Sequence, residues 1–536
     1  MRRLLLAALL LLMWPGSARA EWREASTRHF VIYSEGTEAE LRATAEELER
    51  FDRTLRYKLR RPDPDRSPAT RLTIFILRHQ DQLAGFLGSD RIAGRYFPRY
   101  SGSLAVTHRG VGQRDRDSML DPRTTLLHEY THHFLYNNFA FGAPLWFSEG
   151  YPEFWSTTRS NENGSVDYGR PGAHRSLELS QLPNLHVARL LTVRFPVRDG
   201  ETISATYARG WVLAHYLTFE PAREGQLNAY LRALGEGRTA EDAAKVFGDL
   251  NQLERELQGY LGRNRYRYGT ISAEQVRPGP VTIRRLRPGE EAIMTVRMRT
   301  KRGVDEREAQ TLVAEARRAA APYPDDPLVQ VVLAEVEYDA RNFAQAEAAA
   351  NRALAADPRN VDAHLFKARA IAGRLTAAAA PAGTAPAGTP PASAGATPAP
   401  RPQPSPAEWR EVQRLIAAAN RIDPDDPEPL VAFYDSFEGA GMQPTANAVE
   451  GLLDAQALAP EDRGLRIRAG RQLLALGNAA GARAMLAPVT GDAHSGALGP
   501  AVAEILAGLT DRNTAEAAAK LDAALRQPEG PRRPRR

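Results

Sequence analysis

The 536-residue sequence contains no cysteine, little net charge and no long apolar run after its first residues. The absence of cysteine excludes disulfide bonds, thiolate metal ligands and a cysteine nucleophile. The formal net charge is only +5, which does not indicate a nucleic-acid-binding protein. After residue 20, no stretch approaches the roughly eighteen apolar residues of a membrane-spanning helix. With 43% hydrophobic residues, the chain is long enough for two or three globular domains.

Residues 1–20 have the three parts of a secretory signal peptide. Arg2 and Arg3 form the charged start, residues 4–14 the apolar core, and Ala18-Arg19-Ala20 a small-residue cleavage site. The apolar core is too short to span a bilayer, so a retained membrane anchor is the less favoured alternative. We therefore expect cleavage after Ala20 and a periplasmic or secreted chain without a transmembrane segment.

Three of the eleven histidines lie within residues 128–133, in the pattern His128-Glu129-Tyr130-Thr131-His132. Four residues on an α-helix advance by about 400°, so the imidazoles of His128 and His132 lie on one face and can bind one metal ion. Glu129 flanks that face, where a carboxylate can accept a proton from a metal-activated water. Asp121 is a suitable N-cap and Pro122 a suitable first residue for this helix.

A third metal ligand is expected in the apolar run of residues 144–151. Glu149 lies in this run, and a lone buried carboxylate is costly unless a partner such as a metal ion balances its charge. The alternative is that Glu149 caps a helix or pairs with an arginine. Two histidines and a glutamate favour Zn²⁺ as the ion. Glu153, four residues on, is positioned to hydrogen-bond a ligand histidine.

The segment from His128 to Glu153 resembles the gluzincin metallopeptidases, and more closely the peptidase-MA-like group of bacterial proteins. Weaker matches to that group are an opening strand within residues 22–33, a helix beginning at residues 207–211, and a closing helix from residue 247. The resemblance covers residues 22–265. It implies an α+β zincin-like metallopeptidase domain in which His128, His132 and Glu149 bind zinc and Glu129 is the base. It implies no particular substrate.

Three further residues of this region were considered for roles at the site. Tyr207 begins the later helix of the resemblance and is a candidate to stabilise the oxyanion of the reaction. An ordinary half-buried tyrosine is the alternative, and the sequence alone favours it. His133 points about 100° away from His132 and is expected to be a packed core residue. His108, at the end of a possible edge strand at residues 103–108, is a weaker candidate for the cleft.

Local patterns divide the chain into a mixed N-terminal part and a helical C-terminal part. Strands are expected at residues 30–33, 72–77 and 103–108, with the last as the edge strand beside a peptide substrate. Helices are expected to dominate residues 121–263. Residues 270–300 are interpreted as a β-hairpin linker because Pro288-Gly289-Glu290 is a turn signal between two apolar stretches.

Residues 304–526 are expected to form tetratricopeptide-like helical repeats. Pro324 and Pro358 are 34 residues apart, which is the period of such helix pairs. The next proline marker, Pro424, follows after 66 residues. An Ala/Pro-rich insertion at residues 376–406, expected to be disordered, fills the excess. It would therefore interrupt a repeat between helices at 361–375 and 407–422. Residues 527–536 are expected to be a basic, disordered tail.

Two functions follow from these observations. The first is an exported zinc peptidase that cleaves a peptide or protein substrate, with a protein partner or the substrate recruited by the repeats. The second is a non-catalytic envelope scaffold or binding protein that acts through its repeats and has a structural or vestigial metal site. The intact Glu129 favours the first, because a purely structural site does not need it. A chance motif on a repeat scaffold ranks last.

Overall fold

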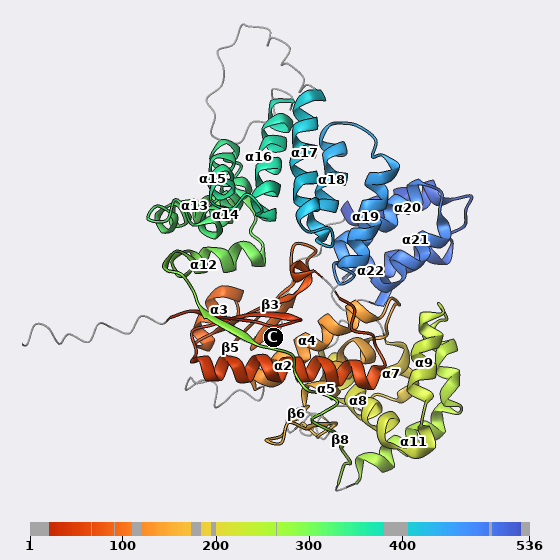
Figure 1. Ribbon diagram of the computed structural model, residues 1–536. Coiled ribbons are helices and arrows are strands. Elements are labelled where there is room, and N and C mark those ends of the chain that lie inside the picture. Colours follow the sequence, from red (N-terminus) through yellow and green to blue (C-terminus); the bar gives the residue numbers. More distant parts are fainter. Residues whose placement is uncertain are drawn as a thin grey trace, which may run out of the picture.

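A mixed α+β N-terminal domain is followed by a mostly helical C-terminal region that arches over it (Figure 1). The computed structural model describes residues 21–65, 67–90, 92–109, 121–172, 179, 184–193, 200–263, 265–379, 406–491 and 496–526. The expected signal peptide, the basic tail and most of the Ala/Pro-rich insertion lie outside these residues. Within the described residues, no helix is both long enough and apolar enough to cross a membrane.

A six-stranded sheet in the order β4-β5-β3-β2-β1-β9 forms the centre of the N-terminal domain. Strands β2, β3 and β5 are parallel, whereas β4, β1 and β9 run antiparallel to their neighbours. The strands are β1 (Arg23–Ser26), β2 (Phe30–Ser34), β3 (Leu72–Leu77), β4 (Gly94–Phe97), β5 (Leu104–His108) and β9 (Thr282–Arg285).

The two edge strands of this sheet are β4 and β9, so the expectation that residues 103–108 (strand β5) form an edge was wrong. Strand β5 pairs with β3 on one side and with β4 on the other. Its alternating sequence suggested one exposed face, yet Thr107 and His108 are both buried. Helices cover both faces of the sheet, so alternation did not report solvent exposure here.

Two sets of helices cover the two faces of the sheet. Helices α2 (Glu38–Leu59) and α4 (Pro122–Asn138) pack on one face, where Leu48, Phe51 and Phe134 join the main apolar core. On the other face, Met294 and Met298 of α12 (Pro288–Arg302) pack with Phe75 and Val106 of the sheet. The sheet is thus completed by a helix that follows the N-terminal domain in sequence.

The hairpin expected at residues 270–300 is not formed, and this prediction was also wrong. Strand β8 (Gly269–Ile271) pairs with β7 (Val166–Tyr168), whereas β9 pairs with β1. The Pro288-Gly289-Glu290 signal begins helix α12, with Pro288 at the first turn and the Glu290 carboxylate accepting from the Arg287 N–H at 2.8 Å. A proline followed by an acidic residue suits a helix start as well as a turn, and packing decided between them.

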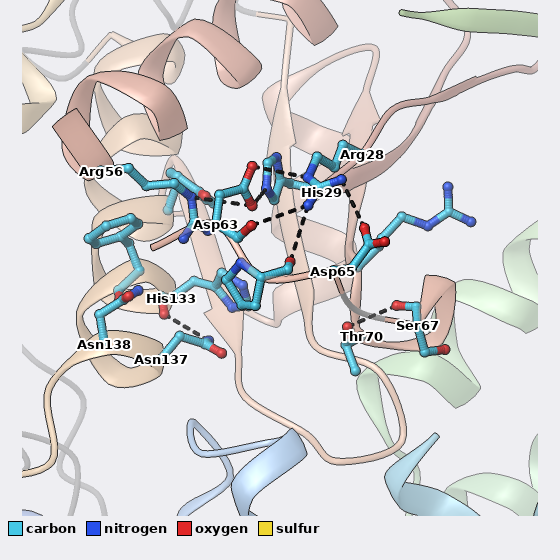
Figure 2. Close-up of a pocket in the computed structure, with 14 residues that line it drawn as sticks. Arg28, His29, Arg56, Asp63, Asp65, Ser67, Thr70, His133, Asn137 and Asn138 are labelled. Atoms are coloured by element: carbon cyan, nitrogen blue, oxygen red, sulfur yellow. Dashed lines mark hydrogen bonds and ion pairs between the residues drawn. The ribbon is translucent and has the colours of Figure 1, made fainter. Parts of the chain in front are cut away.

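A buried ionic cluster fastens the metal-motif helix to the rest of the domain, beside the small cavity shown in Figure 2. The Tyr130 hydroxyl donates to Asp52 Oδ1 at 2.6 Å. The His29 ring pairs with Glu49 Oε2 and Asp63 Oδ1, both at 2.9 Å. Burial lowers the pKa of His29, but Glu49, Asp52 and Asp63 outweigh burial and raise its pKa above 6.5. The imidazole therefore pairs with carboxylates on α2 itself (Glu49 and Asp52) and just after it (Asp63).

The remaining N-terminal elements are mainly helical. One of them, α3 (Gln80–Leu87), packs on the sheet through Leu83. The others are the 3-10 helices η1 (Pro68–Thr70), η4 (Pro221–Arg223) and η5 (Lys245–Phe247), π-helix η3 (Trp146–Gly150), α5 (Tyr151–Ser156), α7 (Val187–Thr192), α8 (Gly200–Phe219), α9 (Gln226–Gly235), α10 (Ala240–Ala244) and α11 (Leu250–Leu261), with the short strand β6 (Arg159–Ser160). Helices therefore dominate residues 121–263, as expected, although β6, β7 and β8 add a second, three-stranded sheet.

The C-terminal region is a succession of helices, as expected. They are α13 (Glu306–Ala320), α14 (Pro327–Asp339), α15 (Phe343–Ala356), α16 (Val361–Ala379), α17 (Pro406–Ile422), α18 (Pro427–Gly439), α19 (Ala446–Leu458), α20 (Arg463–Ala475), α21 (Ala479–Leu486), α22 (Leu498–Ala507) and α23 (Thr514–Arg526). Helices α16 and α17 flank the insertion, and apolar side chains of both, including Leu365 and Trp409, share one cluster. The insertion therefore separates two helices that pack together.

Candidate metal centre

Helix α4 carries the His-Glu-Tyr-Thr-His motif and begins where its sequence predicts. Asp121 is the N-cap, with its carboxylate accepting from the Thr124 N–H at 3.4 Å, and Pro122 is the first residue. Tyr130 and Leu127 are buried in the core, whereas His128 and His132 face η3 and α5, and Glu129 faces strand β4. The helix is thus fixed by burial on one side and presents the motif on the other.

His128, His132 and Glu149 converge, and among the described residues they form a group that could hold a metal ion, here called the metal-binding group. The Nε2 atoms of His128 and His132 lie 3.0 Å apart. Glu149 Oε2 lies 3.7 Å from the first and 3.6 Å from the second. Three ligands at tetrahedral angles, with bonds of about 2.0–2.1 Å to zinc, are separated by about 3.3 Å. The spacing and the donor types therefore fit a divalent cation.

Glu149 reaches the histidines because two backbones approach very closely. It lies in η3, and its neighbour Gly150 packs directly on Gly210 of α8. A Cβ atom at Gly150 would lie 2.5 Å from the Gly210 Cα, which excludes any side chain at this crossing. A π-helical turn is rare and frequently marks a functional site. It is followed directly by α5, so Pro152 lies in the first turn of a new helix, where it breaks no hydrogen bond.

Glu153 orients His128 by contacting the ring nitrogen Nδ1, which does not face the other two ligands. Its Oε1 atom lies 3.0 Å from His128 Nδ1, which leaves Nε2 directed at the other two ligands. Burial lowers the pKa of His128, but Glu153, Glu149 and Glu129 outweigh it and raise the pKa to about 10. His128 therefore carries a proton at neutral pH when no ion is bound, and a metal that binds His128 must displace that proton. A carboxylate behind a ligand histidine is a common feature of metal sites.

Glu129 is held at the edge of the sheet. Its Oε2 atom accepts from the backbone N–H of Tyr96 on β4 at 3.0 Å. Its negative charge also acts on His128. The carboxylate therefore lies between His128 and strand β4.

Two tyrosines flank the ligand histidines. The Tyr207 ring stacks on His128 with centroids 6.2 Å apart and an interplanar angle of 2°, and Tyr136 stacks on His132 at 6.2 Å and 20°. The structure thus brings Tyr207 to the site. Tyr136 was missed from the sequence, although it continues the four-residue spacing of His128 and His132 on the same helix face.

His133 and His108 lie outside the ligand group. His133 was expected in the core, but it is half-buried and lines the cavity of Figure 2, where its Nδ1 lies 2.9 Å from the Tyr96 hydroxyl and joins α4 to β4. His108 is buried at the end of β5. Neither belongs to the metal-binding group identified among the described residues.

Comparison with known proteins gives no assignment. No protein-family model matches the chain, and no curated protein matches it. Any function must therefore be inferred from the site itself.

Proposed function

We propose that the chain is an exported zinc-dependent peptidase with a gluzincin-like N-terminal domain and tetratricopeptide-like repeats. The observation that carries the proposal is the convergence of His128, His132 and Glu149, with Glu129 beside them. Two imidazoles and one carboxylate are a donor set of catalytic zinc sites, which leave one position open for water or substrate. The signal-peptide pattern at residues 1–20 supports export.

The residues around the group supply the functions that peptide hydrolysis requires. When bound, a zinc ion acidifies a water molecule and polarises the scissile carbonyl. Glu129 accepts the proton of that water and passes it to the leaving amine. Tyr207, whose ring stacks on His128, donates a hydrogen bond from its hydroxyl group to the developing oxyanion. Glu153 keeps His128 in the tautomer that binds through Nε2.

The first test is the metal content of the purified mature protein, compared with a His132→Ala variant. We expect about one zinc per wild-type chain and none in the variant. A peptide-library screen then compares wild type with Glu129→Gln, which is expected to keep zinc and lose hydrolysis. No metal in the wild type after zinc is supplied would refute the peptidase. Zinc binding without hydrolysis of any peptide would favour the scaffold function.

A further inference from the structure

The turn between β4 and β5, residues 98–103, is enclosed by helices of the C-terminal region. Tyr100 packs against apolar side chains of α18, α19 and α20 and of the residue after α19, namely Val431, Leu452, Ala455, Ala459, Leu465 and Ala469. Its N–H donates to Asp462 Oδ2 at 2.9 Å, and the Ser103 hydroxyl donates to Glu461 Oε1 at 2.9 Å. The contacts combine apolar burial with two polar anchors, so the turn is held firmly.

Helices from both ends of the arch contact this one turn. Arg99 donates to the carbonyl oxygen of Arg302 at the end of α12. The charges of Arg369 on α16 and of Glu428 on α18 act on the Tyr100 hydroxyl. Because α12, α18, α19 and α20 all contact residues 98–103, the turn lies on the inner side of the helical arch. A partner for that inner side would have to displace it.

The same hairpin ends at the candidate active site. The N–H of Tyr96 donates to Glu129 Oε2 at 3.0 Å. The Tyr96 hydroxyl lies 2.9 Å from His133 Nδ1 and 3.4 Å from Ser103 Oγ. Ser103 also accepts from the Arg99 N–H at 3.1 Å. A continuous set of hydrogen bonds therefore runs from Glu461, through Ser103 and Tyr96, to the helix that carries the metal ligands.

We propose that the C-terminal helices position the base Glu129 by holding the β4–β5 hairpin, with Tyr96 as the positioning residue through which they act. The Tyr96 N–H fixes the Glu129 carboxylate, and the helices fix Tyr96 because they enclose the turn that follows it. The consequence for hydrolysis rests on the proposed function, whereas the mechanical connection does not. Loosening the turn lowers the rate of the chemical step more than it weakens metal binding.

The test loosens the turn from the helical side with an isosteric change. Asp462 caps α20 through Oδ1, which accepts from the Leu465 N–H at 2.8 Å, and holds Tyr100 through Oδ2. In Asp462→Asn the remaining oxygen keeps the cap, but the amide group cannot accept from Tyr100. Asp305→Asn is the matched control, because Asp305 likewise caps a helix, accepting from the Glu308 N–H of α13 at 2.7 Å, whereas it is Arg302 and not Asp305 that bonds the turn. Tyr100→Ala is a second, stronger variant that removes the ring from its cluster.

Residue-resolved hydrogen exchange of the zinc-loaded full chain is the main readout. We expect Asp462→Asn and Tyr100→Ala to speed exchange about tenfold at both the Tyr100 and Tyr96 amides, while Asp305→Asn changes neither. Zinc content stays at the wild-type value. For a peptide that the wild type cleaves, kcat falls about tenfold or more and KM changes less than threefold.

The two proposals fail in distinguishable ways. Faster exchange at Tyr100 with unchanged protection at Tyr96 would overturn the positioning role, whatever the activity. Unchanged kcat in both variants despite faster exchange at Tyr96 would also overturn it. If the wild type cleaves no peptide, the peptidase proposal fails, and exchange at Tyr96 still decides whether the helices hold the base.

Discussion

Replacing Glu153 is expected to weaken zinc binding without removing any ligand of the ion. Glu153 is 4% exposed, and its carboxylate lies 3.0 Å from His128 Nδ1. Glu153→Gln keeps an acceptor for the Nδ1–H but removes the charge that makes His128 a stronger ligand. Such changes behind a ligand typically reduce metal affinity by about 10–100-fold, or about 1.4–2.8 kcal/mol. We expect about tenfold for Glu153→Gln and about 100-fold for Glu153→Ala.

The assay is competition for zinc with a chromophoric chelator at fixed pH and ionic strength. The matched control is Glu49→Gln, because Glu49 is buried and lies 2.9 Å from His29 Nδ1, in a histidine–glutamate pair outside the group of His128, His132 and Glu149. The control is expected to lower the Tm while zinc affinity stays within about twofold. Unchanged affinity in Glu153→Gln, or an equal loss in Glu49→Gln, would refute the argument that Glu153 acts through His128.

Three further outcomes can be measured. Gly210→Ala forces α8 and η3 apart and is expected to cost about 1–3 kcal/mol of unfolding free energy and to weaken zinc binding, whereas Gly259→Ala, with no neighbour within 4 Å of its new Cβ, does neither. Tyr207→Phe is expected to lower kcat about 100-fold with zinc content unchanged, and an unaltered kcat would exclude it as the oxyanion donor. The raised pKa of His29 predicts stabilisation that is full below about pH 6.5 and lost as the pH rises through its folded-state pKa. The Tm difference between wild type and His29→Gln should therefore shrink from pH 6 to pH 9; a constant difference would contradict this.

The residues that the structure brings together at the metal centre were predictable because their signals are local. His128 and His132 share a helix face by spacing alone, and an acid within an apolar run implied that Glu149 needs a cationic partner. Tyr207 was placed near the site only through the resemblance. The contacts among these residues depend on the close packing of Gly150 on Gly210. Two glycines sixty residues apart carry no signal in the sequence that they will meet.

The features that escaped prediction depend on long-range pairing. Tyr96 contacts Glu129 through its backbone N–H, a group that nearly every residue type has, so the sequence does not indicate this contact. Strand β4 has only four residues, too few for a periodicity signal. The alternation of residues 103–108 indicated an edge strand, but α12 covers the face that would otherwise be exposed. Similarly, Pro288 was compatible with a turn or a helix start, and only packing on the sheet selects the helix.

The N-terminal folding unit extends beyond residue 265, where the resemblance to the metallopeptidases ends, because it includes helix α12. Its Met294 and Met298 close the sheet, whereas Ile293 and Val296 on its other side belong to the core shared with α13 and α14. A fragment that stops at residue 265 would leave Phe75 and Val106 facing water and would be prone to aggregate. We therefore expect changes in length to be tolerated between later helices, such as α16 and α17, but not at the junction itself. The two halves of the protein are expected to unfold together rather than in turn.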